Sequence, residues 1–199
     1  GNPHINPNTD ARFLRPNVHK YVNQINREAL SLYNCCSVGE MPCGVSELQA
    51  SEYVGKDRRE LSMVFQFDHM GLDAEKGNKW NIRKFSIPEL GRVMRVWQQH
   101  MLEIMVSAHR HRPRDILPTV DIGWNSLYIE NHDQPRCVSR FGTENPRYRA
   151  ACAKLLATFL LTMRGTVYIF QGQELGMPHP EGWKIEDYSD VETHQYYKA

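Results

Sequence analysis

The chain has 199 residues, of which 41% are hydrophobic, and a formal net charge of +1. This size and composition predict one soluble globular domain with a sizeable core. Nucleic acids and anionic membranes bind concentrated positive charge, which a nearly neutral chain lacks. We therefore expect no nucleic acid and no membrane as the main partner.

The cysteines indicate the compartment. They form no C-x-x-C pair and no metal-ligand spacing, and they are Cys35, Cys36, Cys43, Cys137 and Cys152. An odd number without a disulfide framework favours reduced thiols, so we expect a cytoplasmic protein. No apolar run is long enough to span a bilayer, and the first residues do not begin a signal peptide. Those first residues are typical of the interior of a longer protein.

Helices and strands are predicted to alternate in the first part of the chain. In order, they are a loop over 1–16, a helix from Val18 to Tyr33, a strand from Cys35 to Val38, a helix from Ser46 to Val54 and a strand from Leu61 to Phe67. The helices are predicted from apolar residues at helical spacing. The strands are short apolar runs, each followed by polar or turn residues.

The same alternation continues in the second part. The predictions are a loop over 73–81, a long helix opened by Ser86, a loop over 110–125, a strand over 126–130, a helix over about 146–163 and a strand over 166–170. Ser86-Ile87-Pro88-Glu89 has the form of a capping box with proline in the first turn. Gly165 is the expected C-cap of the later helix.

This order of elements predicts an α/β fold. Near-continuous apolar strands separated by helices are typical of a parallel sheet covered by helices. Four such strands are predicted, whereas a closed (β/α)8 barrel has eight strands and about 250 residues. A small doubly wound sheet is the alternative, but the sequence contains neither a G-x-G-x-x-G loop nor a Walker sequence for a nucleotide.

The most informative stretch is 128–136, Tyr-Ile-Glu-Asn-His-Asp-Gln-Pro-Arg, in which an apolar run ends in polar side chains. Chemistry in parallel α/β folds lies at such carboxyl ends of strands. The stretch resembles the Asn-His-Asp element of glycoside hydrolase family 13, the α-amylase family. Residues 37–42, Ser-Val-Gly-Glu-Met-Pro, resemble its Val-Gly-Glu element after barrel strand five. Residues 64–70 and 166–176 are similar to strands six and eight, and the Ser-Arg-Phe-Gly at 139–142 resembles the oligo-1,6-glucosidase and maltase branch.

The resemblance implies retaining hydrolysis of α-glucosidic bonds, which uses two carboxyl groups about 5 Å apart. It implies that Glu40 is the acid/base and that Asp133 grips the glucose 2- and 3-hydroxyls in the transition state. His132, Gln134 and Arg136 complete the expected substrate-binding set. No cofactor and no metal is implied. Taken alone, Glu40 would more often be a loop carboxylate, and Asp133 an Asx-turn residue beside a solvated histidine. The occurrence of both elements in the family's chain order favours the catalytic interpretation.

One part of the family pattern is absent. The family's nucleophile is an aspartate in a Gly-Phe-Arg-x-Asp element at strand four, and no such sequence precedes Glu40. We therefore expect residues 1–199 to be one partial domain, the second half of a (β/α)8 TIM barrel from after strand four to the start of helix eight. The N-terminal half of the barrel is the missing partner, and without it the chain is expected to be inactive.

The expected whole protein is an α-glucosidase. Its substrates would be short α-glucosides such as maltose, isomaltose or sucrose, with α-1,4 or α-1,6 bonds. Two alternatives are open: a transglucosylase on the same scaffold, and a non-catalytic interaction domain of the same family.

Overall fold

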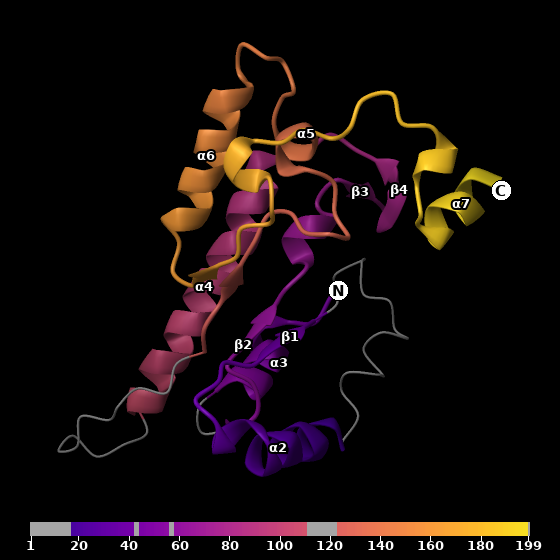
Figure 1. The fold of residues 1–199 in the computed structure, drawn as a ribbon. Coiled ribbons are helices and arrows are strands. Elements are labelled where there is room, and N and C mark those ends of the chain that lie inside the picture. The colour runs from indigo at the N-terminus through magenta and orange to yellow at the C-terminus, as the bar shows by residue number, and fades with distance from the viewer. Residues whose placement is uncertain (1–16, 42–43, 56–57, 111–122, 199) are drawn as a thin grey trace. The chain divides into compact units, whose positions relative to one another are not determined.

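The structure is a computed structural model, and it describes residues 17–41, 44–55, 58–110 and 123–198 (Figure 1). The predicted loop over 1–16 lies outside these ranges, as does most of the predicted loop over 110–125. The chain divides into two compact units. The first consists of residues 1–129 and 158–168, and the second of residues 130–157 and 169–199.

The first unit contains the strands and most of the helices. Its strands are β1 (Val38–Glu40), β2 (Met63–Phe65), β3 (Ala74–Glu75), β4 (Asn78–Ile82), β5 (Ser126–Leu127) and β6 (Thr166–Val167). Its helices are α2 (Val18–Glu28), α3 (Glu47–Val54) and α4 (Ile87–Arg110), with the 3-10 turns η1 (Leu30–Leu32) and η3 (Asp68–Gly71). The helices predicted in this part of the chain are therefore present, although α2 ends at Glu28 and not at Tyr33. β2, β5 and β6 are shorter than the predicted strands, and β1 overlaps the strand predicted from Cys35 to Val38 only at Val38.

The four parallel strands follow one another in chain order. β1 pairs with β2 and β5 pairs with β6, both in parallel. A parallel bridge between Val64 and Asn125 joins the two pairs, which gives the order β1-β2-β5-β6. Sequential strands that lie side by side with helical connections are the usual arrangement of a parallel sheet. Within the described residues the strands do not close into a barrel.

The core of the first unit lies where α3 packs against α4 and against β2 (Figure 1). Its buried members are Met41, Val45, Ala50, Tyr53, Val54, Val64, Trp97 and Met101. α3 begins with a capping box, in which the Ser46 hydroxyl accepts the Gln49 N–H and the Gln49 side chain accepts the Ser46 N–H. Met94, Trp97 and Met101 of α4 are buried, so this side of the helix faces the core.

A hairpin occupies the segment predicted as a loop over 73–81, so that prediction is wrong. β3 and β4 pair in antiparallel fashion, with Ala74 opposite Ile82 and Glu75 opposite Asn78. Lys76 and Gly77 connect them with positive φ angles of 51° and 79°. Two consecutive positive φ angles are what a tight two-residue hairpin turn requires, and glycine adopts them without steric cost. The turn forms the hairpin although the flanking residues lack apolar alternation.

The second unit is largely helices and irregular segments. It contains α5 (Cys137–Phe141), most of α6 (Arg149–Leu161), α7 (Val191–Lys198) and the 3-10 turns η4 (Gln173–Leu175) and η5 (Ile185–Asp187). α6 confirms the helix predicted over about 146–163, whereas the five-residue α5 was not predicted. A Cβ atom on Gly142, just after α5, would collide with the Cys152 sulfur of α6. Glycine therefore allows α5 and α6 to approach closely.

Candidate active site

Glu40 is the last residue of β1, and its side chain is exposed. The strand ladder fixes the backbone around it, because Glu40 is paired with Phe65 and the Met41 N–H donates to the Phe65 carbonyl at 2.9 Å. Met41, the next residue, is buried in the core. An exposed carboxylate thus stands on a fixed backbone at the carboxyl end of a parallel strand, where such folds carry catalytic groups.

Asp68 binds Gly44, four residues after Glu40. Its Oδ1 accepts the Gly44 N–H at 3.2 Å, and its Oδ2 accepts the Trp97 indole N–H at 3.0 Å. Burial raises the pKa of Asp68, and these two hydrogen bonds offset part of the rise. Asp68 therefore links Trp97 of α4 with the backbone of Gly44.

A buried network surrounds Tyr128. Gln66 Oε1 accepts the Asp68 N–H at 2.8 Å, which turns the Gln66 amide nitrogen toward His69 Nδ1, also at 2.8 Å. Because Nδ1 accepts this hydrogen bond, the ring proton of His69 is on Nε2, and Nε2 donates to the Tyr128 carbonyl at 2.9 Å. The Tyr128 hydroxyl donates to the Gln66 carbonyl at 3.0 Å. His69 is thus a neutral ring with both nitrogens bonded, which is the pattern of a structural histidine.

Asp133 lies in the second unit, in an exposed loop. Its N–H donates to Asn131 Oδ1 at 2.9 Å, which makes the Asx turn that the sequence offered as the ordinary interpretation. Its Oδ2 lies 3.4 Å from His132 Nε2, and the two side chains are 65% and 73% exposed. The structure therefore brings His132 and Asp133 together at the surface of their unit.

The other two predicted substrate-binding residues contact protein groups. Gln134 Oε1 accepts a hydrogen bond from Arg140 Nη1 at 2.6 Å. Arg136 Nη1 donates to Glu130 Oε1 at 2.8 Å and to the Gln171 carbonyl at 2.7 Å. The Arg136 side chain is only 17% exposed. These contacts favour a structural role for Arg136.

Glu130 is a residue that the sequence reasoning missed. Its side chain is 1% exposed, and its Oε2 accepts the Cys137 N–H at 2.6 Å. Burial raises the pKa of the Cys137 thiol, and the hydrogen bond to Glu130 and its charge raise it further. The available signal was a glutamate at the end of an apolar run with an arginine six residues later.

The predicted site residues are divided between the units. Glu40 belongs to the first, whereas His132, Asp133, Gln134 and Arg136 belong to the second.

Across the described ranges, no group of three or more histidine, cysteine, aspartate or glutamate side chains could hold a metal ion. Of the helices that the structure describes, none has the length and apolar character needed to cross a bilayer.

Comparisons with known proteins give consistent matches. The family described as "Alpha amylase, catalytic domain" matches residues 3–198. An oligo-1,6-glucosidase of Parageobacillus thermoglucosidasius is 46% identical over 183 residues, which are 92% of this chain and 29% of the relative. An α-glucosidase of Schizosaccharomyces pombe is 38% identical over 185 residues, again 92% and 29%. The crystal structure of a Bacillus licheniformis trehalose-6-phosphate hydrolase matches with a TM-score of 0.78 and 38% identity, over 92% of this chain and 30% of that chain. The chain thus spans less than a third of the length of these relatives.

Proposed function

The chain belongs to the α-amylase catalytic-domain family, and we propose that it is the second half of the (β/α)8 barrel of a retaining α-glucosidase. The observation that carries the proposal is Glu40, an exposed carboxylate at the end of β1 in the parallel order β1-β2-β5-β6. The preceding half of the barrel supplies the nucleophile. The whole enzyme acts on short α-glucosides such as maltose, isomaltose or sucrose.

The reaction has two steps. In the first, the nucleophilic carboxylate attacks C1 of glucose, the bond from C1 to the glycosidic oxygen breaks, and Glu40 gives its proton to that oxygen. In the second, Glu40 takes a proton from water, the water oxygen bonds to C1, and the nucleophile is released. Asp133 binds the 2- and 3-hydroxyls, an interaction that strengthens as the ring gains oxocarbenium character. His132, beside Asp133, donates a hydrogen bond to the same hydroxyls.

Two other functions use the same scaffold. A transglucosylase replaces the water of the second step with a sugar hydroxyl, but the relatives named above are glucosidases and a hydrolase. A non-catalytic interaction domain has no need for the carboxylates of Glu40 and Asp133, which this chain keeps. Free thiols at Cys35, Cys36 and Cys137 support a reducing, cytoplasmic location.

The experiment uses the full-length enzyme, by which we mean the longer protein that contains this chain and the preceding half of the barrel. Glu40→Gln should lower the maltose rate by about 10²–10⁴-fold, the usual contribution of general acid–base catalysis. Much more activity should remain on α-glucosyl fluoride, because fluoride departs without a proton.

Glu28→Gln is the matched control, since Glu28 is an exposed glutamate of α2, and its maltose rate should equal that of the unmodified enzyme. An unchanged maltose rate in Glu40→Gln would show that Glu40 is not the acid/base. Oligosaccharides in excess over glucose at high maltose would favour the transglucosylase instead.

A further inference from the structure

A single buried carboxylate closes the base of the loop that carries Asp133. Glu130 directly precedes the loop over 131–135. The two side-chain oxygens of Glu130 bind Arg136 and Cys137, the two residues that follow the loop. Oε1 accepts from Arg136 Nη1 at 2.8 Å, and Oε2 accepts the Cys137 N–H at 2.6 Å. The residues before and after the loop are therefore held together by the Glu130 carboxylate.

Arg136 extends this closure to a second segment. The two hydrogens of its Nη1 serve two acceptors, Glu130 Oε1 and the Gln171 carbonyl at 2.7 Å. Its guanidinium lies over the Phe170 ring, 4.9 Å from the ring centre. A Cβ atom on Gly172 would lie 3.3 Å from Arg136 Nη1, so the backbone approaches the guanidinium closely. The loop base is thus fixed to the segment 170–172 of the same unit.

The burial of these groups contrasts with the exposure of the loop. Glu130 is 1% exposed, whereas the Asp133 side chain is 65% exposed. A buried carboxylate is costly unless charged and polar donors satisfy it, and Glu130 has both kinds. Buried ion pairs add little net stability, but they can select one conformation. Here that conformation is the one of the loop over 131–135, which lies between Glu130 and its partners Arg136 and Cys137.

We propose that Glu130 is a positioning residue for Asp133, which acts by holding the loop over 131–135 in the conformation that presents Asp133 to the glucose 2- and 3-hydroxyls. This role rests on the proposed function. It also assigns Arg136 to the base of the loop and not to a contact with the sugar.

The test compares two substrates in the full-length enzyme. Glu130→Gln keeps the size of the side chain and removes its charge. It should lower kcat/KM on 4-nitrophenyl α-glucoside about 100-fold, the effect expected when a catalytic group is misplaced by about 1 Å. On the 2-deoxy analogue the loss should be about tenfold or less, because the contact of Asp133 with the 2-hydroxyl is absent from that substrate. The ratio of the two values is independent of the amount of folded enzyme, so partial unfolding of the variant does not affect it.

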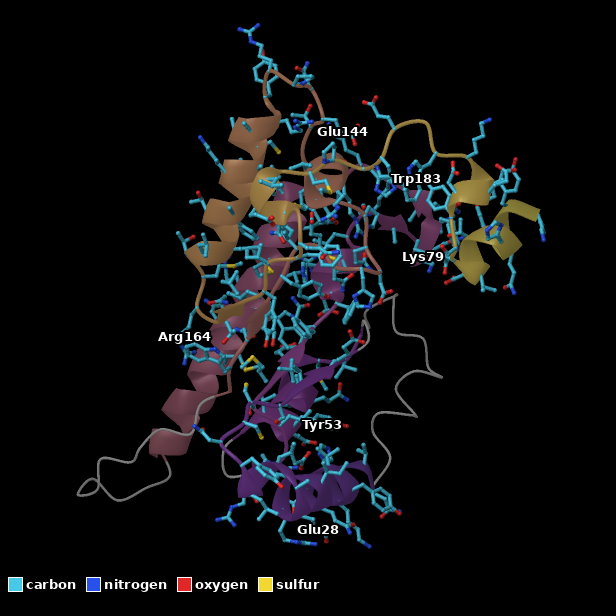
Figure 2. All side chains as sticks on the ribbon, viewed as in Figure 1. Glu28, Tyr53, Lys79, Glu144, Arg164 and Trp183 are labelled. Carbon is cyan, nitrogen blue, oxygen red and sulfur yellow. The ribbon has the colours of Figure 1, made fainter. Side chains whose placement is uncertain are left out.

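Two further variants complete the design. In an Asp133→Asn background, Glu130→Gln should cost little, because a residue that acts through Asp133 loses its effect when Asp133 is altered. Glu144→Gln is the matched control: Glu144 is an exposed glutamate of the same unit, and both substrates should be hydrolysed at unchanged rates (Figure 2).

The outcomes separate the inference from the proposed function. Equal losses on the two substrates, or no loss on either, would overturn the positioning role of Glu130 while leaving Asp133 in place. Full additivity of Glu130→Gln and Asp133→Asn would overturn it as well. An Asp133→Asn variant with unchanged kcat/KM on both substrates would instead overturn the role of Asp133 in the proposed function, and the inference with it.

Discussion

Replacing Trp97 by phenylalanine removes one hydrogen-bond donor from a partly buried carboxylate. The Trp97 indole N–H donates to Asp68 Oδ2 at 3.0 Å, and the Gly44 N–H donates to Oδ1 at 3.2 Å. A hydrogen bond to a charged group contributes about 1.5–3 kcal/mol to stability, and one between neutral groups about 0.5–1.5 kcal/mol. We expect Trp97→Phe to lower the free energy of unfolding by about 1.5–3 kcal/mol at neutral pH from this bond, in addition to the cost of the smaller ring.

The pH dependence isolates the contribution of the carboxylate. Burial raises the pKa of Asp68 above its ordinary value, and the Trp97 hydrogen bond opposes that rise. The folded protein therefore holds the Asp68 proton more tightly than the unfolded chain, and the stability due to Asp68 falls as the pH rises through its folded pKa. Trp97→Phe raises this pKa further, so the variant's loss of stability should be larger near pH 7 than near pH 4 by about 1 kcal/mol.

The assay is denaturant unfolding of the full-length enzyme at several pH values. Trp124→Phe is the matched control, because the Trp124 indole donates to the neutral Thr166 hydroxyl at 2.9 Å. The cost of Trp124→Phe should not change over the same pH range. A Trp97→Phe cost that is as independent of pH as the control would refute the reasoning about Asp68.

Three further predictions concern single residues. Gly172→Ala should lower the free energy of unfolding by about 1–2 kcal/mol, because Gly172 has a positive φ of 88° and the new Cβ would lie 2.9 Å from Met177 Cε. By displacing Arg136 it should also reproduce part of the substrate-selective loss of Glu130→Gln. An unchanged ratio of kcat/KM on the two substrates would contradict this. Met101→Ala should lower the free energy of unfolding by about 2–5 kcal/mol, because the Met101 side chain is 0% exposed. A decrease of less than about 1 kcal/mol would show that the core near α4 is loosely packed. The raised pKa of Cys137 predicts that iodoacetamide alkylates this thiol more slowly at pH 8 in the folded enzyme than in the unfolded chain. Because the unfolded chain loses the thiol proton at a lower pH, the free energy of unfolding should fall as the pH rises above the ordinary thiol pKa of 9.0. This fall should be smaller in Cys137→Ala. Mass spectrometry of the Cys137 peptide measures the first effect, and equal rates in the two states would contradict it.

Elements with strong local signals could be predicted from the sequence. α4 begins at Ile87 because the Ser86 hydroxyl accepts the Glu89 N–H, which is the capping pattern written in the sequence. The parallel strands could be found from their apolar runs, although the ladders are shorter, as with Ser126–Leu127 in place of 126–130. A strand's apolar run continues into residues that are buried without being paired in the ladder, and Ile129 is such a residue.

Features that depend on the chain folding back could not be predicted. The β3–β4 hairpin is formed by its turn and not by an apolar pattern. The pairing of Glu130 with Arg136 depends on how the intervening loop bends, and spacing alone does not determine that bend. The sequence placed Arg136 among the substrate-binding residues, and its hydrogen bonds to Glu130 and to the Gln171 carbonyl could not be predicted from spacing.

The closed base of the loop over 131–135 makes that segment modular. Glu130 precedes the segment and binds Arg136 and Cys137, which follow it, so the residues of the segment can vary without altering the bonds at the base. A designer who transplants the segment should move Glu130, Arg136 and Cys137 with it, together with residues 170–172, because Arg136 also binds the Gln171 carbonyl. Libraries that randomise Gln134 or Pro135 while keeping those three residues should retain a high fraction of folded members.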